Sequence, residues 1–279
     1  MTAADIWREQ LEAWRIPDEL LAAVAESPYT WPKKLWKRRA ERALDVERSS
    51  PTLEAVKRLV GDGSVLDVGA GTGRASLPLV RDGYRVTMIE PNPTMLEGLL
   101  ELKGELGFAV IAGRWPDVAK EVNPHNVALS AHVVYDIADI APFLAALDES
   151  ATSGVVLELT PAHPWVNLGP LYRELHDLDR PSGPTVDDLK NVIKETIGAD
   201  PVVERLSRPA DLVFETVGEA VEFTARRLVL PPARWPELER LLLPQIVGRA
   251  GHWQVAPIER ELCTLWWRAN STGSAVGRE

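Results

Sequence analysis

The sequence has one cysteine and a shortage of positive charge. Because Cys263 stands alone, the chain can form neither an internal disulfide nor a zinc–cysteine cluster, which fits a reducing compartment. The sequence has 31 Lys and Arg residues against 41 Asp and Glu residues, which gives a formal net charge of -10. Proteins that hold nucleic acid by broad electrostatic attraction depend on clustered cations, so a nucleic-acid partner is not expected.

Long apolar runs and linker-like segments are also missing. No segment reaches the roughly 18 consecutive apolar residues of a membrane span, and the N-terminus has no apolar stretch of signal length. No long Ser, Gly or charged run divides the chain. We therefore expect a cytoplasmic protein without a membrane partner. It should have an N-terminal helical extension over residues 1–50, one domain over 51–270 and a flexible tail over 271–279.

From Pro51 onward, helical periodicity alternates with short apolar strands. This order is typical of an α/β fold, and strands that are apolar on both faces belong to a parallel sheet covered by helices on both sides. The first expected strands are 65–69, 85–90, 108–113, 126–132 and 154–160, with helices 52–60, 74–82, 93–103 and about 139–149. Beyond Pro161 we expect helix 187–196 with Thr185 as its N-cap, strands 202–207, 212–216 and 262–269, and helices 218–228 and 236–248.

The most informative stretch is Val65–Arg74, VLDVGAGTGR, in which an apolar strand leads into a glycine-rich turn and then a helix. Glycines let the backbone approach a ligand closely, and helix N-terminal amides supply hydrogen-bond donors. A P-loop is excluded because no Gly-Lys-Ser/Thr follows. A dinucleotide fingerprint fits poorly, because counting from Gly69 and Gly71 puts Arg74 where a small residue is needed.

The remaining pattern is G-x-G-x-G, with Asp67 inside the preceding strand and Glu90 at the end of the next one. In these features the sequence resembles the class I S-adenosylmethionine-dependent methyltransferase family, of the small-molecule type. The resemblance implies a Rossmann-like, doubly wound, mostly parallel seven-stranded sheet with helices on both faces. Asp67 would organise the turn or bind the amino group of the cofactor. A carboxylate at Glu90 can accept hydrogen bonds from both ribose hydroxyls.

The resemblance also implies which residues hold S-adenosylmethionine, whose product is S-adenosylhomocysteine. The glycine turn would face the methionine portion, and the residues after Glu90 would border the adenine. After the third strand the family usually has an acidic residue, where this chain has Arg114; backbone amides would then read the adenine edge while Trp115 packs on its ring. The expected cofactor residues are Asp67, Gly69, Ala70, Gly71, Gly73, Glu90, Pro91, Asn92, Gly113, Arg114, Trp115 and Ser130.

The methyl acceptor should lie beyond the fourth and fifth strands, because open parallel sheets bind ligands at their carboxyl ends. Methyl transfer from a sulfonium is an in-line displacement that needs a general base only if the acceptor must lose a proton. His132 titrates in the useful range and is the first candidate for that base. Tyr135 and His163 are the next catalytic candidates, although all three could instead be hydrogen-bonded supports of their loops.

Aromatic residues of the N-terminal extension could cover the acceptor. Family members often place N-terminal helices and an insertion after strand five over this site. The resemblance thus makes Tyr29 and Trp31, together with the stretch 165–184, candidates for a lid. Ordinary helix packing is the commoner role of such aromatic residues.

Three functions stay open at this point. The first is a methyltransferase acting on a small molecule, and the second is one acting on RNA or protein through the basic run 33–42, although such a run is usually a solvated helix face. The third is a cofactor-binding module without catalysis. No metal is expected, because the only acidic pair after strand four, Asp136 and Asp139, suits a helix start. The sequence specifies neither the acceptor nor an oligomeric state.

Overall fold

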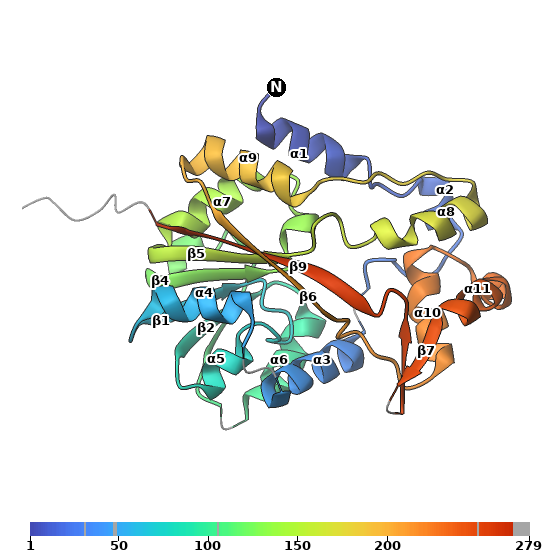
Figure 1. Ribbon diagram of the computed structural model, residues 1–279, viewed down its shortest axis with the longest axis horizontal. Coiled ribbons are helices and arrows are strands. Elements are labelled where there is room, and N and C mark those ends of the chain that lie inside the picture. Colours follow the sequence, from blue (N-terminus) through green and yellow to red (C-terminus); the bar gives the residue numbers. More distant parts are fainter. Residues whose placement is uncertain (31, 47–48, 105, 250, 270–279) are drawn as a thin grey trace, which may run out of the picture.

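One seven-stranded sheet organises the protein. The computed structural model describes residues 1–30, 32–46, 49–104, 106–249 and 251–269. The strands lie in the order β3-β2-β1-β4-β5-β9-β6, and neighbours are parallel except that β9 is antiparallel to both β5 and β6. Their bounds are β1 Ser64–Val68, β2 Arg85–Glu90, β3 Ala109–Ala112, β4 His125–Ala131, β5 Ala151–Leu159, β6 Val202–Pro209 and β9 Glu259–Arg268. The predicted α/β fold is therefore confirmed (Figure 1).

Helices cover both faces of the sheet, as strands without a polar face require. On one face α3, α4, α5 and α6 pack, and on the other α1, α7 and α9 (Figure 1). Their bounds are α1 Ala3–Glu12, α3 Lys33–Val46, α4 Pro51–Val60, α5 Leu77–Arg81, α6 Pro93–Lys103, α7 Ile140–Glu149 and α9 Val186–Ile197. In the part of the chain that the structure describes, no helix combines the length and the apolar character of a bilayer span. The cytoplasmic location stays a prediction.

A second group of elements lies beyond the carboxyl end of β5 (Figure 1). It consists of α2 Asp18–Ala22, α8 Gly169–His176, α10 Val217–Arg227, α11 Trp235–Leu242 and the hairpin of β7 Ile246–Arg249 and β8 His252–Val255. Helices α8, α10 and α11 share an apolar cluster of their own, which includes Tyr172, Leu228 and Leu238. Apart from α2, which belongs to the N-terminal segment, two insertions build this group, one between β5 and α9 and one between β6 and β9. The sequence patterns predicted no such second cluster.

The strand predicted over 212–216 is wrong. Only Phe214 forms a bridge, to Trp253 of β8. The segment cannot continue as a strand because Thr216 caps α10, its side chain accepting a hydrogen bond from the amide of Glu219. Local capping chemistry therefore overrides the β-propensity of the apolar residues before it.

Two predicted helices have different ends. The helix predicted over 236–248 stops at Leu242, and residues 246–249 pair as β7 instead. Pro244 lies between them, and its missing N–H and fixed φ interrupt the helical ladder. The helix predicted over 74–82 begins only at Leu77, because the glycine turn extends further than the motif suggested.

The N-terminal extension is packed onto the domain, and two hydrogen bonds show how its helices are attached. The indole of Trp7 in α1 donates a hydrogen bond to the carbonyl of Ile137 at 2.9 Å. The carbonyl of Trp36 in α3 accepts one from the hydroxyl of Thr72, inside the glycine turn, at 2.9 Å. The division between extension and domain stays a prediction, and the predicted tail, 271–279, falls outside the described residues.

Thr185 caps α9 as the sequence predicts, in a capping box with Asp188. The side chain of Asp188 accepts from the Thr185 amide at 2.8 Å, and the Thr185 hydroxyl accepts from the Asp188 amide at 3.3 Å. Thr185→Ala should lower the free energy of unfolding by about 1 kcal/mol, because helix N-terminal amides lose their acceptor. Urea unfolding followed by circular dichroism measures the change. Thr196→Ala, inside the same helix, should cause no loss, since alanine has the higher helix propensity; equal losses would contradict the capping role.

Candidate functional site

The glycine turn after β1 is tied to the end of β2. The amides of Gly69 and Ala70 both donate to the carbonyl of Ile89, at 2.9 and 3.0 Å. The amide of Gly73 closes the turn by donating to the carbonyl of Ala70 at 2.8 Å. The predicted turn thus joins two strands at their carboxyl ends.

Gly69 and Gly71 need glycine for different reasons. Both have positive φ, 74° and 59°, a conformation that side chains disfavour. A Cβ on Gly69 would lie 2.4 Å from a methyl group of Val133, so packing excludes a side chain there. A Cβ on Gly71 would meet no atom within 4 Å. Gly71 therefore faces open space, where a ligand can approach the backbone.

Glu90 lies across from this turn and is 5% exposed. One carboxylate oxygen accepts from the amide of Gly71 and the other from the amide of Asn92, both at 2.7 Å. Burial raises the pKa of Glu90, and the two backbone hydrogen bonds oppose that rise. Each oxygen keeps a further lone pair, so the carboxylate can also accept hydrogen bonds from ligand hydroxyls.

Asp67 and Ser130 stand beneath the turn in β1 and β4. Burial raises the pKa of Asp67 to about 7. Both carboxylate oxygens are buried, and the nearby Ser76 hydroxyl opposes this rise. The hydroxyl of Ser130 donates to the carbonyl of Val68 at 2.9 Å. Ser130 thus joins the ends of β1 and β4, and its hydroxyl proton is used in this hydrogen bond within the protein.

The two residues after Glu90 begin α6. Pro91 is exposed, and Asn92 is the N-cap, its side chain accepting from the amides of Thr94 and Met95 at 2.9 and 3.2 Å. A cavity of about 350 Å³ lies here, lined by Ser27, Tyr29, Thr30, Asn92 and Thr94. The predicted lid residue Tyr29 and the predicted adenine neighbour Asn92 therefore share one cavity.

The three residues predicted to border the adenine after β3 have different environments. A Cβ on Gly113 would lie 2.3 Å from a methyl group of Val118, so packing alone explains this glycine. Arg114 is exposed. Trp115 is 4% exposed and donates to the carbonyl of Phe143 at 3.3 Å. Its packing on an adenine ring stays a prediction, and the core of the domain already covers most of its surface.

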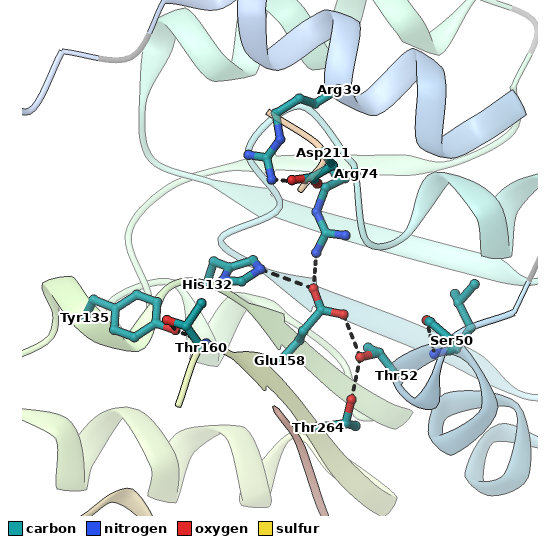
Figure 2. Close-up of polar contacts among 11 residues, drawn as sticks. Arg39, Ser50, Thr52, Arg74, His132, Tyr135, Glu158, Thr160, Asp211 and Thr264 are labelled. Atoms are coloured by element: carbon teal, nitrogen blue, oxygen red, sulfur yellow. Dashed lines mark hydrogen bonds and ion pairs between the residues drawn. The ribbon is translucent and has the colours of Figure 1, made fainter. Parts of the chain in front are cut away.

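Glu158 in β5 is the centre of a buried polar network (Figure 2). One of its oxygens accepts from Arg74 and lies 3.3 Å from Nε2 of His132. The other accepts from the hydroxyl of Thr52 at 2.6 Å, which itself lies 2.7 Å from that of Thr264. Burial alone would raise the pKa of Glu158, but Arg74 and His132 hold it well below its usual range. Glu158 is thus an ionised carboxylate inside the protein.

A second ion pair lies beside the first (Figure 2). Arg39 of α3 contacts Asp211 at 2.7 Å. Burial would raise the pKa of Asp211, but Arg39 and Arg74 keep it well below its usual range. The site therefore holds the buried acid Glu158, the half-buried acid Asp211 and two arginines beside His132.

Sequence analysis missed Glu158, and it considered Arg74 only as a misfit to a dinucleotide fingerprint. One signal was available, because Glu158 is the only charged residue in the apolar run 154–160. A lone acid in a buried strand needs a partner. The sequence could not say which arginine supplies it.

His132 is the first residue after β4 and has φ 60°. Its side chain is 29% exposed. Burial lowers the pKa of His132, and Glu158 opposes that fall. The imidazole is therefore neutral near pH 7.

The hydroxyl group of Tyr135, the second catalytic candidate, is occupied by hydrogen bonds within the protein. Its hydroxyl accepts from the amide of Thr160 and lies 2.6 Å from the Thr160 hydroxyl, which donates to the carbonyl of Ala162 at 2.6 Å. Because the Thr160 hydroxyl already donates its proton to Ala162, the Tyr135 hydroxyl must be the donor in its hydrogen bond with Thr160. Burial raises the pKa of Tyr135. These contacts favour a structural role over proton transfer.

His163, the third candidate, is buried among aromatic rings. Its ring stacks on Trp14 with centroids 4.1 Å apart, and Nδ1 accepts from the amide of Trp165 at 3.2 Å. Burial lowers the pKa of His163 to about 3, so the ring is neutral and its proton is on Nε2. This arrangement favours a hydrogen-bond donor over a general base.

Of the two predicted lid residues, Tyr29 is described and Trp31 lies outside the described residues. Tyr29 is 46% exposed and stacks on Trp165 with centroids 5.6 Å apart. With the contact between Trp14 and His163, this stack joins the N-terminal segment to the segment after β5. The structure brings His132, Tyr135 and His163 together at the same end of the sheet, with ring centroids 6.3 and 5.7 Å apart in that order.

Comparison with known proteins agrees with this geometry. The model of the methyltransferase domain family matches residues 66–157, from β1 to β5. No curated protein matches the sequence. A solved structure described as "Conversion of a Disulfide Bond into a Thioacetal Group during Echinomycin Biosynthesis" has a TM-score of 0.53 and 14% identity, covering 85% of this chain and 90% of that chain. It shares the fold.

Two further solved structures are more distant. Magnesium protoporphyrin IX methyltransferase from Synechocystis PCC 6803, with bound SAH, has a TM-score of 0.45 and 11% identity, covering 89% of this chain and 93% of that chain. TehB from Haemophilus influenzae has a TM-score of 0.46 and 14% identity over 81% of this chain, which spans only 64% of the length of TehB. Residues 66–157 thus match a methyltransferase domain, and the sheet order and the glycine turn opposite Glu90 agree with the Rossmann-like methyltransferase fold.

Proposed function

We propose that the protein methylates a small molecule bound beyond the carboxyl ends of β4 and β5. The observation that carries this proposal is a connected set of aromatic rings at that end of the sheet. Trp14 stacks on His163 and Tyr29 on Trp165, and the ring of Tyr135 lies 5.7 Å from that of His163 and 6.3 Å from that of His132. Small-molecule sites are lined mainly by apolar and aromatic side chains with a few polar groups, which is the composition of this region.

The residues around the glycine turn fit the cofactor. Gly71 offers backbone in open space, and Glu90 keeps lone pairs for two hydroxyl groups. Asp67 is a buried acid two residues before the turn, where it can organise the turn or face the amino group of the cofactor. When bound, S-adenosylmethionine supplies an electrophilic methyl group and leaves as S-adenosylhomocysteine. The chain contributes alignment and the exclusion of water.

We assign the role of general base to His132. Its Nε2 lies 3.3 Å from the ionised carboxylate of Glu158, so this nitrogen keeps the ring proton. Nδ1 makes no hydrogen bond with a described residue and has a lone pair to accept a proton from the acceptor. The lowered pKa leaves the ring unprotonated at neutral pH, as a base requires.

The alternative acceptor, RNA or protein, depended on the basic run 33–42. Lys33 and Lys37 both pair with Glu101 of α6, at 2.9 and 2.8 Å, and Arg38 pairs with two glutamates around the start of α10. These pairs attach α3 to the domain and reduce the positive field that the run offers to phosphates. The observations thus support a small acceptor over a nucleic acid.

Gly71→Val should abolish binding of S-adenosylhomocysteine, because a branched side chain would occupy the open space and strain the positive φ. Isothermal titration calorimetry measures the loss. Gly83→Val is a matched control, since Gly83 also has positive φ and open space but lies at the turn between α5 and β2. The control should be strained in the same way yet still bind. A folded Gly71→Val variant with normal affinity would remove the turn from the cofactor site.

Glu90→Ala should weaken binding of S-adenosylhomocysteine by about 1 to 3 kcal/mol, the range for lost hydrogen bonds to a charged group. The variant also removes the acceptor of the Gly71 and Asn92 amides, so Glu90→Gln is the informative companion. Glutamine keeps the shape but can accept only through one oxygen, and an intermediate affinity is expected by calorimetry. Unchanged affinity in both variants would exclude Glu90 from the site.

The acceptor class can be tested with methyl-labelled S-adenosylmethionine and a cell extract separated into small-molecule, RNA and protein fractions. The wild type should label the small-molecule fraction, and His132→Ala should reduce that label by at least about 100-fold, as expected for loss of a general base. His125→Ala, at the opposite end of β4, should leave it unchanged. Label in RNA or protein would contradict the small acceptor. Cofactor binding without label in any fraction would favour a binding module.

A further inference from the structure

We infer that Glu158 is a positioning residue that sets the tautomer of His132 and links this histidine to the glycine turn through Arg74. The inference deepens the proposed function, since it concerns the base assigned there. Glu158 lies one residue beyond the part of the chain that the family model matches. Figure 2 shows the contacts of its carboxylate.

Glu158 holds His132 at two points. The backbone carbonyl of Glu158 accepts from the amide of His132 at 2.7 Å, and a side-chain oxygen lies 3.3 Å from Nε2. The histidine has φ 60°, an unusual conformation for a residue with a side chain, which persists only where the surroundings hold it. The backbone contact stabilises this turn and directs the imidazole toward the carboxylate.

The carboxylate is itself held rigidly. Glu158 is 3% exposed, and its contacts come from separate elements: Thr52 from α4, Arg74 from the segment after the glycine turn, and His132 from the end of β4. Thr264 of β9 supports Thr52 from behind. A carboxylate held by three contacts cannot rotate away from the His132 ring, so Nε2 always faces a carboxylate oxygen that accepts hydrogen bonds.

This arrangement determines the protonation of the ring. A carboxylate accepts hydrogen bonds only, so Nε2 must carry the proton and Nδ1 must carry the lone pair. When Nδ1 takes a proton from the small molecule that is to be methylated, the negative charge of Glu158 stabilises the resulting imidazolium. The positive charges of Arg74 and Arg39 oppose it, and Asp211 supports it. The neutral Tyr135 ring lies 6.3 Å away, centroid to centroid.

Arg74 connects the same carboxylate to the cofactor turn. It follows Gly73 directly in the sequence and pairs with the oxygen of Glu158 that faces His132. Any ligand that moves the turn therefore moves a positive charge relative to the pair of Glu158 and His132. The position of the turn and the basicity of His132 are coupled through one oxygen atom.

The test is nitrogen-15 NMR of histidine side chains in the full chain, with the His132 signals assigned by their absence from His132→Ala. In the wild type, His132 should be the Nε2–H tautomer. Glu158→Gln should lower the pKa of His132 by about 1, because removing the nearby negative charge destabilises the imidazolium. It should also allow both tautomers, since an amide can present either a donor or an acceptor. A purely structural carboxylate would change neither quantity.

Thr264→Val is the matched control, because it removes a hydroxyl from the same network but no charge and no contact with His132. It should leave the tautomer and the pKa of His132 unchanged. If Glu158→Gln does not fold, Glu158→Asp is the second variant. Aspartate keeps the negative charge that pairs with Arg74, but its shorter side chain no longer extends to Nε2 of His132. Both ring tautomers of His132 should then be observed. A wild-type Nδ1–H tautomer, or an unchanged His132 in the folded Glu158 variants, overturns the inference. Failure of the wild type to bind S-adenosylhomocysteine contradicts the proposed function instead, and the NMR result is independent of it.

Discussion

The site depends on the compensation of one buried negative charge. An ionised carboxylate removed from water is stable only where opposite charge and hydrogen-bond donors replace its hydration. Glu158 obtains these from Arg74, Thr52 and His132, which belong to three different elements. The ends of β1, β4 and β5 therefore cannot shift independently without exposing an uncompensated charge. Hydrophobic packing builds the sheet, and this ion pair aligns its carboxyl edge (Figure 2).

Most of the sheet and its first helices were predictable because their patterns are strong and local. The strand 85–90 and the helix 93–103 have the predicted ends. Apart from the late start of the helix predicted over 74–82, the errors occurred beyond Pro161, where tertiary contacts override local preference. Residues 246–249 look helical by their apolar content, yet they pair with β8 after Pro244 interrupts the helix. The separate apolar cluster of α8, α10 and α11 joins residues from two insertions, and no local pattern shows that they meet.

The sequence identified the correct edge of the sheet for chemistry but not the chemistry of each side chain there. His132 and His163 are the same residue type after neighbouring strands. Their environments differ, because Nδ1 of His163 accepts from a backbone amide while Nε2 of His132 faces a carboxylate. Glu158 was missed because its importance comes from Arg74, 84 positions away in the sequence. Residue type and position in the chain cannot show which nitrogen carries a proton.

The antiparallel strand β9 lies between β5 and β6, although it follows both of them in the sequence. Until residues 259–268 have left the ribosome, the edge of β5 that later pairs with β9 has no neighbour, and Thr52 lacks Thr264. During synthesis the growing chain therefore has an unpaired strand edge, and such edges are prone to associate with other chains. The polar network around Glu158 becomes complete only when a strand distant in the sequence has joined the sheet.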